Sequence, residues 1–589
     1  MGRERDRHRR VVVANGGGRS EVKRKHVIPV SICAAVLILG FASLDQYGVS
    51  WDDALGDLFF GERYLSFLTS FDAAYLDTSR NPYPPERTPN LFGSPFRVKP
   101  WEYYPVSNIL GAATSAVLSR RLGLLDPFDG FHALNLLLAI PFVFALFAWM
   151  RRATGDLAAA SAVLLLLLSP RIVCDLMANI KDFPEMVFFS LALLAFHTGW
   201  ERGSTRWILG SGALWGLALG TKANALFVPV VVGAFLLFAP RAKPDDTRPA
   251  RLSRGRLAIA LVAAGAIGFA LTVALWPYLW SDPVGRFAQN LRYIANQKFQ
   301  VRAESVAEPL QQILLTTPIP FLLLFAAGLV PLARRLRSRE PFAILVAAWL
   351  AIVAGRLYLP NAVNFDGVRH FLELFPPMAA VGGLGAAWVA SAASRVAGAP
   401  LARVAPVAIV AALLGSCAFS LARSHPFEIA YWNAFAGGLE GAQARRIPQA
   451  CDYWALSYRV ALRWINENAP PGAVLAVPIA EHSVRLTARE WLRSDVTLAF
   501  DMLDGRLPAD PRWPINSPNA LTSPVAPDID PARLELLRRV ARERPVFVML
   551  VPREDWSNAL IDECRERHPL AAEWRRGGAP VVQIFRFLG

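Results

Sequence analysis

Two adjacent carboxylates, Asp52 and Asp53, stand in the stretch Ser-Trp-Asp-Asp, shortly after the first long apolar run of the chain. Adjacent carboxylates of this kind can supply a general base and can bind a metal ion or a substrate hydroxyl. The alternative is structural, because an aspartate just ahead of a helix that begins near Ala54 is a common N-terminal cap. The spacing alone favours the cap, and both interpretations stay open on the sequence.

Three further charged residues interrupt apolar runs: Lys181 and Asp182, in Asn-Ile-Lys-Asp-Phe-Pro, and the single Lys222. Charges at such positions often anchor a chain at a membrane interface, and a lysine can extend its ammonium group towards water. The mouth of a helix bundle is also where a membrane enzyme holds an anionic substrate, and an ammonium group there offers a cation to a phosphate. The sequence does not decide between these two functions.

Four ionisable residues crowd the start of a later apolar run: Asp366, Arg369, His370 and Glu373. Ionisable groups are costly where they face lipid, so they pair with one another or face the interior of a bundle. A structural network of ion pairs is one explanation of the crowding. A phosphate site built on Arg369 is the other.

The runs that separate these residues have the composition of membrane-spanning helices. Of the 589 residues, 54% are hydrophobic and only 19% are charged, which is too apolar for a set of soluble domains. The apolar residues gather in runs of roughly 15 to 20, the length that a helix needs to cross the hydrocarbon. We therefore expect a polytopic α-helical membrane protein.

Clusters of Lys and Arg between the runs indicate cytoplasmic loops and so predict which runs cross the membrane. This pattern also accounts for the net charge of +15 without nucleic-acid binding. With every cluster inside, the N-terminus is cytoplasmic and eleven spans are expected. They are residues 27–44, 131–150, 157–173, 186–200, 207–221, 223–239, 257–278, 313–332, 342–358, 374–393 and 404–422.

Residues 104–122 are apolar enough for a short span, but counting them would invert every later loop. We expect them, and residues 286–297, to lie along the membrane surface as amphipathic helices. The first outside loop is then residues 45–130. All the ionisable candidates fall on that same outer face, which is the strongest indication of an active site that the residues give.

The chain divides into three parts. Residues 1–26 form a basic cytoplasmic tail that we expect to be disordered, residues 27–422 form the membrane module, and residues 423–589 have a different composition. In this last part, helical patterns at 458–468 and 533–542 alternate with strand-like runs at 473–478, 545–551 and 581–587. We expect a small α/β domain outside the membrane. The five cysteines have no metal-binding spacing, and pairing of Cys451 with Cys564 is left open.

Four motifs give the chain a resemblance to a known class of enzymes. In order they are Ser-Trp-Asp-Asp at 50–53, Ser-Pro-Arg at 169–171 followed by Asn-Ile-Lys-Asp-Phe-Pro, Gly-Thr-Lys-Ala-Asn at 220–224, and Asp-Gly-Val-Arg-His-Phe at 366–371. The series resembles the GT-C class of glycosyltransferases, in the group with protein O-mannosyltransferases and lipid A aminoarabinose transferases (family 39). That group has two surface helices in its first outside loop, which match residues 51–71 and 104–122. It commonly has Asp-Glu where this chain has Asp52 and Asp53.

The resemblance implies transfer of a sugar from a polyprenyl-phosphate donor to a hydroxyl of a lipid, glycan or protein acceptor, with inversion at the anomeric carbon. Asp52 would deprotonate the acceptor, Asp53 would orient sugar or acceptor, and Asp182 would be a second acid in the pocket. The leaving phosphate needs cations. The candidates to bind it are Lys181, Lys222, Arg369 and, behind them, His370. Assistance by a divalent metal ion is left open.

The richness in Ala and Arg indicates a bacterial inner-membrane protein. Two alternatives to an enzyme remain. A secondary transporter of a lipid-linked or anionic substrate also carries charges among many spans, but the sequence has no inverted repeat. A non-catalytic membrane scaffold that displays residues 423–589 would keep its function after Asp52→Asn, whereas the enzyme would lose it.

Overall fold

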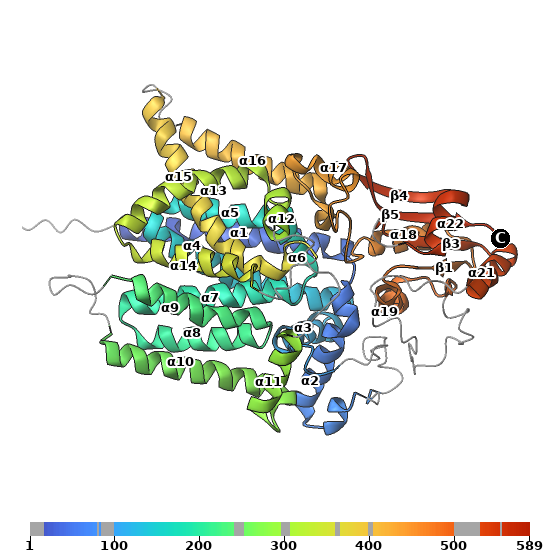
Figure 1. Cartoon of the computed structure of the whole chain (residues 1–589), viewed down its shortest axis with the longest axis horizontal. Helices are drawn as coiled ribbons and strands as arrows, with labels where there is room; N and C mark the ends of the chain where they lie inside the picture. Colours follow the sequence, from blue (N-terminus) through green and yellow to red (C-terminus); the bar gives the residue numbers. More distant parts are fainter. Residues whose placement is uncertain are drawn as a thin grey trace, which may run out of the picture.

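The computed structural model describes residues 17–78, 82–83, 99–240, 252–295, 307–359, 366–397, 404–499, 531–553 and 557–589. Long helices lie side by side along the longest axis of the molecule, and a mixed domain of helices and strands stands at one end of them (Figure 1). Residues 1–16 of the predicted basic tail lie outside the described residues.

Six of the described helices are long and apolar enough to cross a membrane. They are α1 (Gly17–Ser43), α4 (Pro127–Thr154), α10 (Arg254–Leu275), α13 (Ile319–Arg337), α15 (Phe375–Val396) and α16 (Ala405–Ser424). A bent pair, α5 (Asp156–Leu167) and α6 (Pro170–Ala178), raises the number to seven if the pair is one span. The chain is therefore a multi-pass helical membrane protein.

Four other described helices, which are too short or not apolar enough to be candidate spans, occupy further predicted spans. They are α7 (Asp182–Arg202), α8 (Thr205–Leu219), α9 (Phe227–Phe238) and α14 (Pro341–Arg356). Two of the eleven predicted spans are broken. Residues 157–173 bend by 66° where α6 begins at Pro170, and residues 313–332 divide between α12 (Glu308–Thr316) and α13 on either side of Pro318. Proline disfavours helical backbone at the residue before it, so a continuous helix over either range is wrong.

The helices expected at the membrane surface are separate from the candidate spans. In Figure 1, α2 (Leu58–Ser70) and α11 (Pro283–Ala295) run across the long helices near the end that faces the C-terminal domain. Between them in sequence, α3 (Val106–Ser115) continues as a π-helical turn, η6 (Ala116–Arg121), and packs against α2 and α4. Neither α3 nor α11 is among the apolar helices that could span a membrane.

Small residues bring the helices that carry the candidate site residues close to their neighbours. A Cβ added at Gly216 of α8 would lie 2.3 Å from the carbonyl oxygen of Gly268 in α10, and one added at Gly385 of α15 would come even closer to Leu324 in α13. Close backbone approach of this kind is how helices associate in lipid. It fixes α8, whose end leads to Lys222, and α15, which follows Arg369.

The C-terminal part contains a five-stranded sheet with the strand order β2-β1-β3-β5-β4. Its strands are β1 (Val474–Ala476), β2 (Thr497–Leu498), β3 (Val546–Leu550), β4 (Leu570–Arg576) and β5 (Ala579–Phe587). β1 is parallel to β2 and β3, whereas β5 is antiparallel to β3 and β4. β1, β3 and β5 coincide with the three predicted strand-like runs.

The α-helices described in this part are α17 (Gly438–Ala444), α18 (Tyr458–Asn468), α19 (Glu481–Trp491), α21 (Pro531–Glu543) and α22 (Ala559–Arg567). α18 and α21 coincide with the predicted helical patterns, while α19 and α22, like β2 and β4, were not predicted. Cys451 and Cys564 are both buried free thiols in separate hydrophobic clusters, so they do not pair.

A buried arginine joins the C-terminal domain to the membrane helices. Arg459 of α18 binds both carboxylate oxygens of Asp129 at 2.6 and 3.0 Å and reaches Asp126 at 2.7 Å, at the start of α4. The ring of Trp491 in α19 lies 3.9 Å from its guanidinium carbon. Because α19 also contacts the residues after Asp52, the contacts of Arg459 and α19 place the C-terminal domain directly beside those residues.

Candidate active site

Asp52 is the carboxylate on which the cations of the site converge. Its Oδ2 lies 3.0 Å from Nη1 of Arg369 and 3.5 Å from Nζ of Lys181. Desolvation opposes its ionisation, but Arg369 and Lys181 outweigh that effect and lower the pKa of Asp52. Its side chain makes no capping hydrogen bond. The interpretation of Asp52 as a helix cap is therefore wrong, and its carboxylate is ionised among cations.

Lys181 bridges Asp52 and a carboxylate that was not predicted. Its Nζ lies 2.9 Å from Oδ2 of Asp57, which is fully buried, and 5.7 Å from the centre of the Tyr103 ring. Oδ1 of Asp57 accepts a hydrogen bond of 3.0 Å from the Asn108 amide of α3. Asp57 was missed because it stands five residues after Asp52, a spacing that an ordinary helix would not place on the same side.

Asp53 faces away from this group. Its Oδ2 lies 3.1 Å from Nε2 of His132 in α4 and accepts the backbone N–H of Ser50 at 3.2 Å. The side chain of Asp53 is 2% exposed, against 27% for that of Asp52. The two carboxylates are adjacent in sequence but lie in separate surroundings, so they do not act on a common partner.

Asp182, in the first turn of α7, binds two cationic side chains and accepts a hydrogen bond from an amide. Oδ1 of Asp182 binds Nζ of Lys222, and Oδ2 lies 3.4 Å from Nη1 of Arg369. Nδ2 of Asn179 donates to Oδ2 at 2.8 Å. Nζ of Lys222 also lies 3.3 Å from Nδ1 of His370. The second, third and fourth sequence motifs therefore meet at the carboxylate of Asp182.

Both terminal nitrogens of the Arg369 guanidinium bind carboxylates. While Nη1 serves Asp52 and Asp182, Nη2 binds Oδ2 of Asp366 at 2.7 Å, in a turn where Asp366 has a positive φ of 58°. The ring of Trp454, from the segment before α18, lies 4.8 Å from the guanidinium carbon. Trp454 was not predicted, since a lone aromatic residue in a loop gives no signal of its partner.

The predicted crowd at residues 366–373 separates into two groups. Glu373 binds Nη2 of Arg356 at 2.6 Å, whereas Asp366 binds Arg369. Arg356 also donates to the carbonyl oxygen of His370 at 2.8 Å and to the side chain of Asn224 at 2.9 Å. Arg356 and Asn224 both donate to the carbonyl oxygen of His370, so this second group fixes the backbone next to Arg369.

Six of the seven predicted site residues therefore belong to one network, and Asp53 stands apart from it. The six are Asp52, Lys181, Asp182, Lys222, Arg369 and His370. The acids of the network bind Lys and Arg, and in the part of the chain that the structure describes no three His, Cys, Asp or Glu residues are arranged to hold a metal ion. The network can stabilise an anion and accept a proton.

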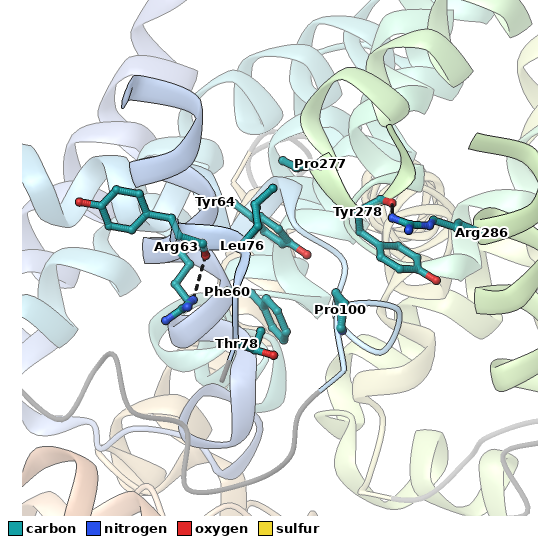
Figure 2. Close-up of a pocket in the computed structure, with 10 residues that line it drawn as sticks. Phe60, Arg63, Tyr64, Leu76, Thr78, Pro100, Pro277, Tyr278 and Arg286 are labelled. Atoms are coloured by element: carbon teal, nitrogen blue, oxygen red, sulfur yellow. Dashed lines mark hydrogen bonds between the residues drawn. The ribbon is translucent and has the colours of Figure 1, made fainter. Parts of the chain in front are cut away.

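A pocket of about 260 Å³ lies beside this network, between α2 and α11. Figure 2 shows Phe60 and Tyr64 on one side of it and Tyr278 and Arg286 on the other. None of the predicted site residues lines it. The ring of Phe60 contacts that of Tyr103, which in turn lies over Lys181, so this ring pair lies between the pocket and the charged network.

Comparison with known families supports the resemblance that the motifs indicate. Residues 128–273 match the family model described as dolichyl-phosphate-mannose-protein mannosyltransferase. This range holds three of the seven predicted site residues: Lys181, Asp182 and Lys222. The match confirms the resemblance to glycosyltransferases of the GT-C class. No curated protein matches the chain.

The structure is also similar to solved membrane proteins. ArnT from Cupriavidus metallidurans in the apo state is 16% identical, with 96% of this chain and 98% of that chain covered and a TM-score of 0.47. The same ArnT bound to undecaprenyl phosphate is 15% identical with the same coverage and a TM-score of 0.48. An oligosaccharyltransferase from Archaeoglobus fulgidus in the apo form is 12% identical, with 82% of this chain and 65% of that chain covered and a TM-score of 0.49.

Proposed function

We propose that this protein is a membrane glycosyltransferase that moves a sugar from a polyprenyl-phosphate donor to a hydroxyl group of an acceptor, with inversion. The observation that carries the proposal is the convergence of Asp52, Lys181 and Arg369, from three distant segments, on one charged site. The family match over residues 128–273 supports the choice of chemistry.

Asp52 is the best placed general base. It is the most exposed acid of the network, and its lowered pKa keeps it ionised and able to accept a proton at neutral pH. As the acceptor hydroxyl gives its proton to Asp52, its oxygen attacks the anomeric carbon. The bond between that carbon and the phosphate oxygen breaks, and its electron pair leaves with the polyprenyl phosphate. Attack opposite to the leaving group inverts the anomeric centre.

Lys181, Lys222 and Arg369 supply positive charge for the leaving phosphate. Lys181 and Lys222 are partly exposed, so their ammonium groups can contact a phosphate directly, and His370 lies beside Lys222. Cations fixed where negative charge develops stabilise the transition state more than the ground state. Arg369 is buried and holds three carboxylates in place. Asp182 positions the cations, and Asp53, bound to His132 and to the backbone N–H of Ser50, holds the turn that leads to Asp52.

For the topology we propose that all eleven predicted spans cross the membrane. The N-terminus then lies in the cytoplasm, and residues 423–589 lie outside a bacterial inner membrane. In support of this arrangement, each predicted range contains at least part of a described helix. The acceptor is then a lipid, glycan or protein in the cell envelope.

The test is turnover of a lipid-linked sugar by the purified protein in lipid nanodiscs. Radiolabelled polyprenyl-phosphate mannose, polyprenyl-phosphate glucose and polyprenyl-phosphate aminoarabinose are offered with a membrane extract as the source of acceptor. We expect one of them to lose its label to an acceptor or to water, and Asp52→Asn to reduce the rate by about 10²- to 10⁴-fold, the usual contribution of a general base.

Asp45→Asn is the matched control, because Asp45 is an exposed acid of the same loop that pairs with Arg463. It should keep the wild-type rate. Equal rates for wild type and Asp52→Asn would disprove the assignment of the base. If the wild type moves an intact donor across the bilayer of a proteoliposome without breaking it, the protein is a transporter.

A further inference from the structure

The two carboxylates that share Lys181 are brought together by an uncommon turn of helix. Asp53–Asp57 forms a π-helical turn, η2, in which the N–H of Leu58 bonds to the carbonyl of Asp53, five residues back. Residues five apart lie roughly above one another in such a turn, whereas an α-helix would separate them by about 140°. Asp52 and Asp57 therefore point to the same side, and Nζ of Lys181 lies 3.5 Å from one and 2.9 Å from the other.

Asp57 has no access to a substrate. Its side chain is 0% exposed, and its two oxygens bind Asn108 and Lys181. The charged and titratable groups that face it are Lys181, from the turn before α7, the carboxylates of Asp52 and Asp53, and the phenol of Tyr103. A buried acid with these partners acts through Lys181 rather than on a ligand.

Under the proposed function, Asp52 is the general base, and Lys181 lies beside it. An ammonium group close to a carboxylate makes it a weaker base, because the charge favours the ionised form. The ammonium is 0.6 Å nearer to Asp57 than to Asp52, from 3.5 Å less 2.9 Å, so an ionised Asp57 takes the larger share of its charge. The negative charge of Asp57 also acts directly on Asp52 and makes that carboxylate more basic.

Resting on the proposed function, we propose that Asp57 is a positioning residue that holds Lys181 and thereby keeps Asp52 basic enough to take the proton of the acceptor. Loss of its charge leaves Lys181 to act on Asp52 alone. Asp52 then stays ionised but becomes a weaker base.

The ionisation of Asp57 gives this role a dependence on pH. Burial raises its pKa to about 6, although Lys181 acts in the opposite direction. Above that pH Asp57 is charged and shares Lys181, and below it Asp57 is neutral. Donor turnover in the wild type should therefore fall as the pH drops through about 6, while Asp52, with its lowered pKa, is still ionised.

The experiment compares kcat/KM against pH, for the donor that the wild type turns over, in wild type, Asp57→Asn and Asp57→Glu. In Asp57→Asn we expect the rate above pH 6 to fall about tenfold, which is one pKa unit of basicity, and the step near pH 6 to disappear. Asp57→Glu keeps the charge and should restore the step. Glu62→Gln is the matched control, because Glu62 is a buried acid of α2 that binds Arg120 instead. It should leave the step in place.

A second comparison isolates the path through Lys181. In a Lys181→Gln background, Asp57→Asn should change the rate less than threefold at any pH, since only the direct effect of Asp57 on Asp52 remains. This comparison uses a background without the ion pair, so it also stands if the single variant Asp57→Asn folds poorly.

A step near pH 6 that persists in Asp57→Asn overturns the proposal. So does an equally large effect of Asp57→Asn with and without Lys181. Both results leave the proposed function intact, because they are measured on an enzyme that turns over the donor, whereas no turnover by the wild type contradicts the function itself.

Discussion

Replacement of Arg369 by lysine tests whether the site depends on the two arms of a guanidinium and not only on its charge. In the structure Nη1 serves Asp52 and Asp182, and Nη2 serves Asp366. A lysine ammonium is a single nitrogen on a longer flexible stem and does not reproduce this planar fork. Arg369→Lys should therefore keep the net charge of the site and lose at least one hydrogen bond to a carboxylate.

A hydrogen bond to a charged group contributes about 1.5–3 kcal/mol. If the lost bond serves the transition state, kcat/KM falls about 10- to 150-fold, since about 1.4 kcal/mol corresponds to a factor of ten. The assay is turnover of the labelled donor, with unfolding temperature measured in parallel. Arg463→Lys is the control, because Arg463 pairs with Asp45 at the surface and exposed pairs contribute about 0–1 kcal/mol. Wild-type kcat/KM in Arg369→Lys would refute the reasoning, since charge alone would then suffice.

Three other substitutions follow from the same contacts. Arg459→Ala leaves two acids at the start of α4 without their cation and should cost about 3–5 kcal/mol, seen as a lower unfolding temperature, whereas Arg463→Ala should change it little. Gly56→Ala places a Cβ 2.4 Å from the ring of Tyr103, so it should displace that ring from Lys181 and slow donor turnover at least tenfold; an unchanged rate would contradict the packing. Asp53→Asn should slow donor turnover far less than Asp52→Asn does, because the carboxylate of Asp53 faces His132. Equal losses in the two variants would indicate that Asp53 acts at the reacting centre.

The membrane helices could be predicted because their signal is local. A run of apolar residues indicates a span by its length, and each predicted range contains at least part of a described helix. The breaks in two of these ranges were not predicted. They occur at Pro170 and Pro318, where hydropathy alone indicates a continuous helix.

The charged site was predicted less completely, because its contacts join distant segments. Residue type and position pointed to Asp52, Lys181 and Arg369, which the structure brings together. The same reasoning paired Asp52 with its neighbour in sequence. The π-helical turn, which no spacing rule reveals, replaces that neighbour by Asp57. Trp454 comes from a segment beyond the last membrane helix, and its place over Arg369 depends on how the C-terminal domain docks.

The most direct test of the central claim is a structure of the protein with polyprenyl phosphate bound, determined in lipid nanodiscs. We expect the phosphate within hydrogen-bonding distance of at least two of Lys181, Lys222 and Arg369, and the carboxylate of Asp52 on the side where the acceptor approaches. A phosphate bound away from all three cations would contradict the account, because the network around Asp52 would then have no leaving group to stabilise.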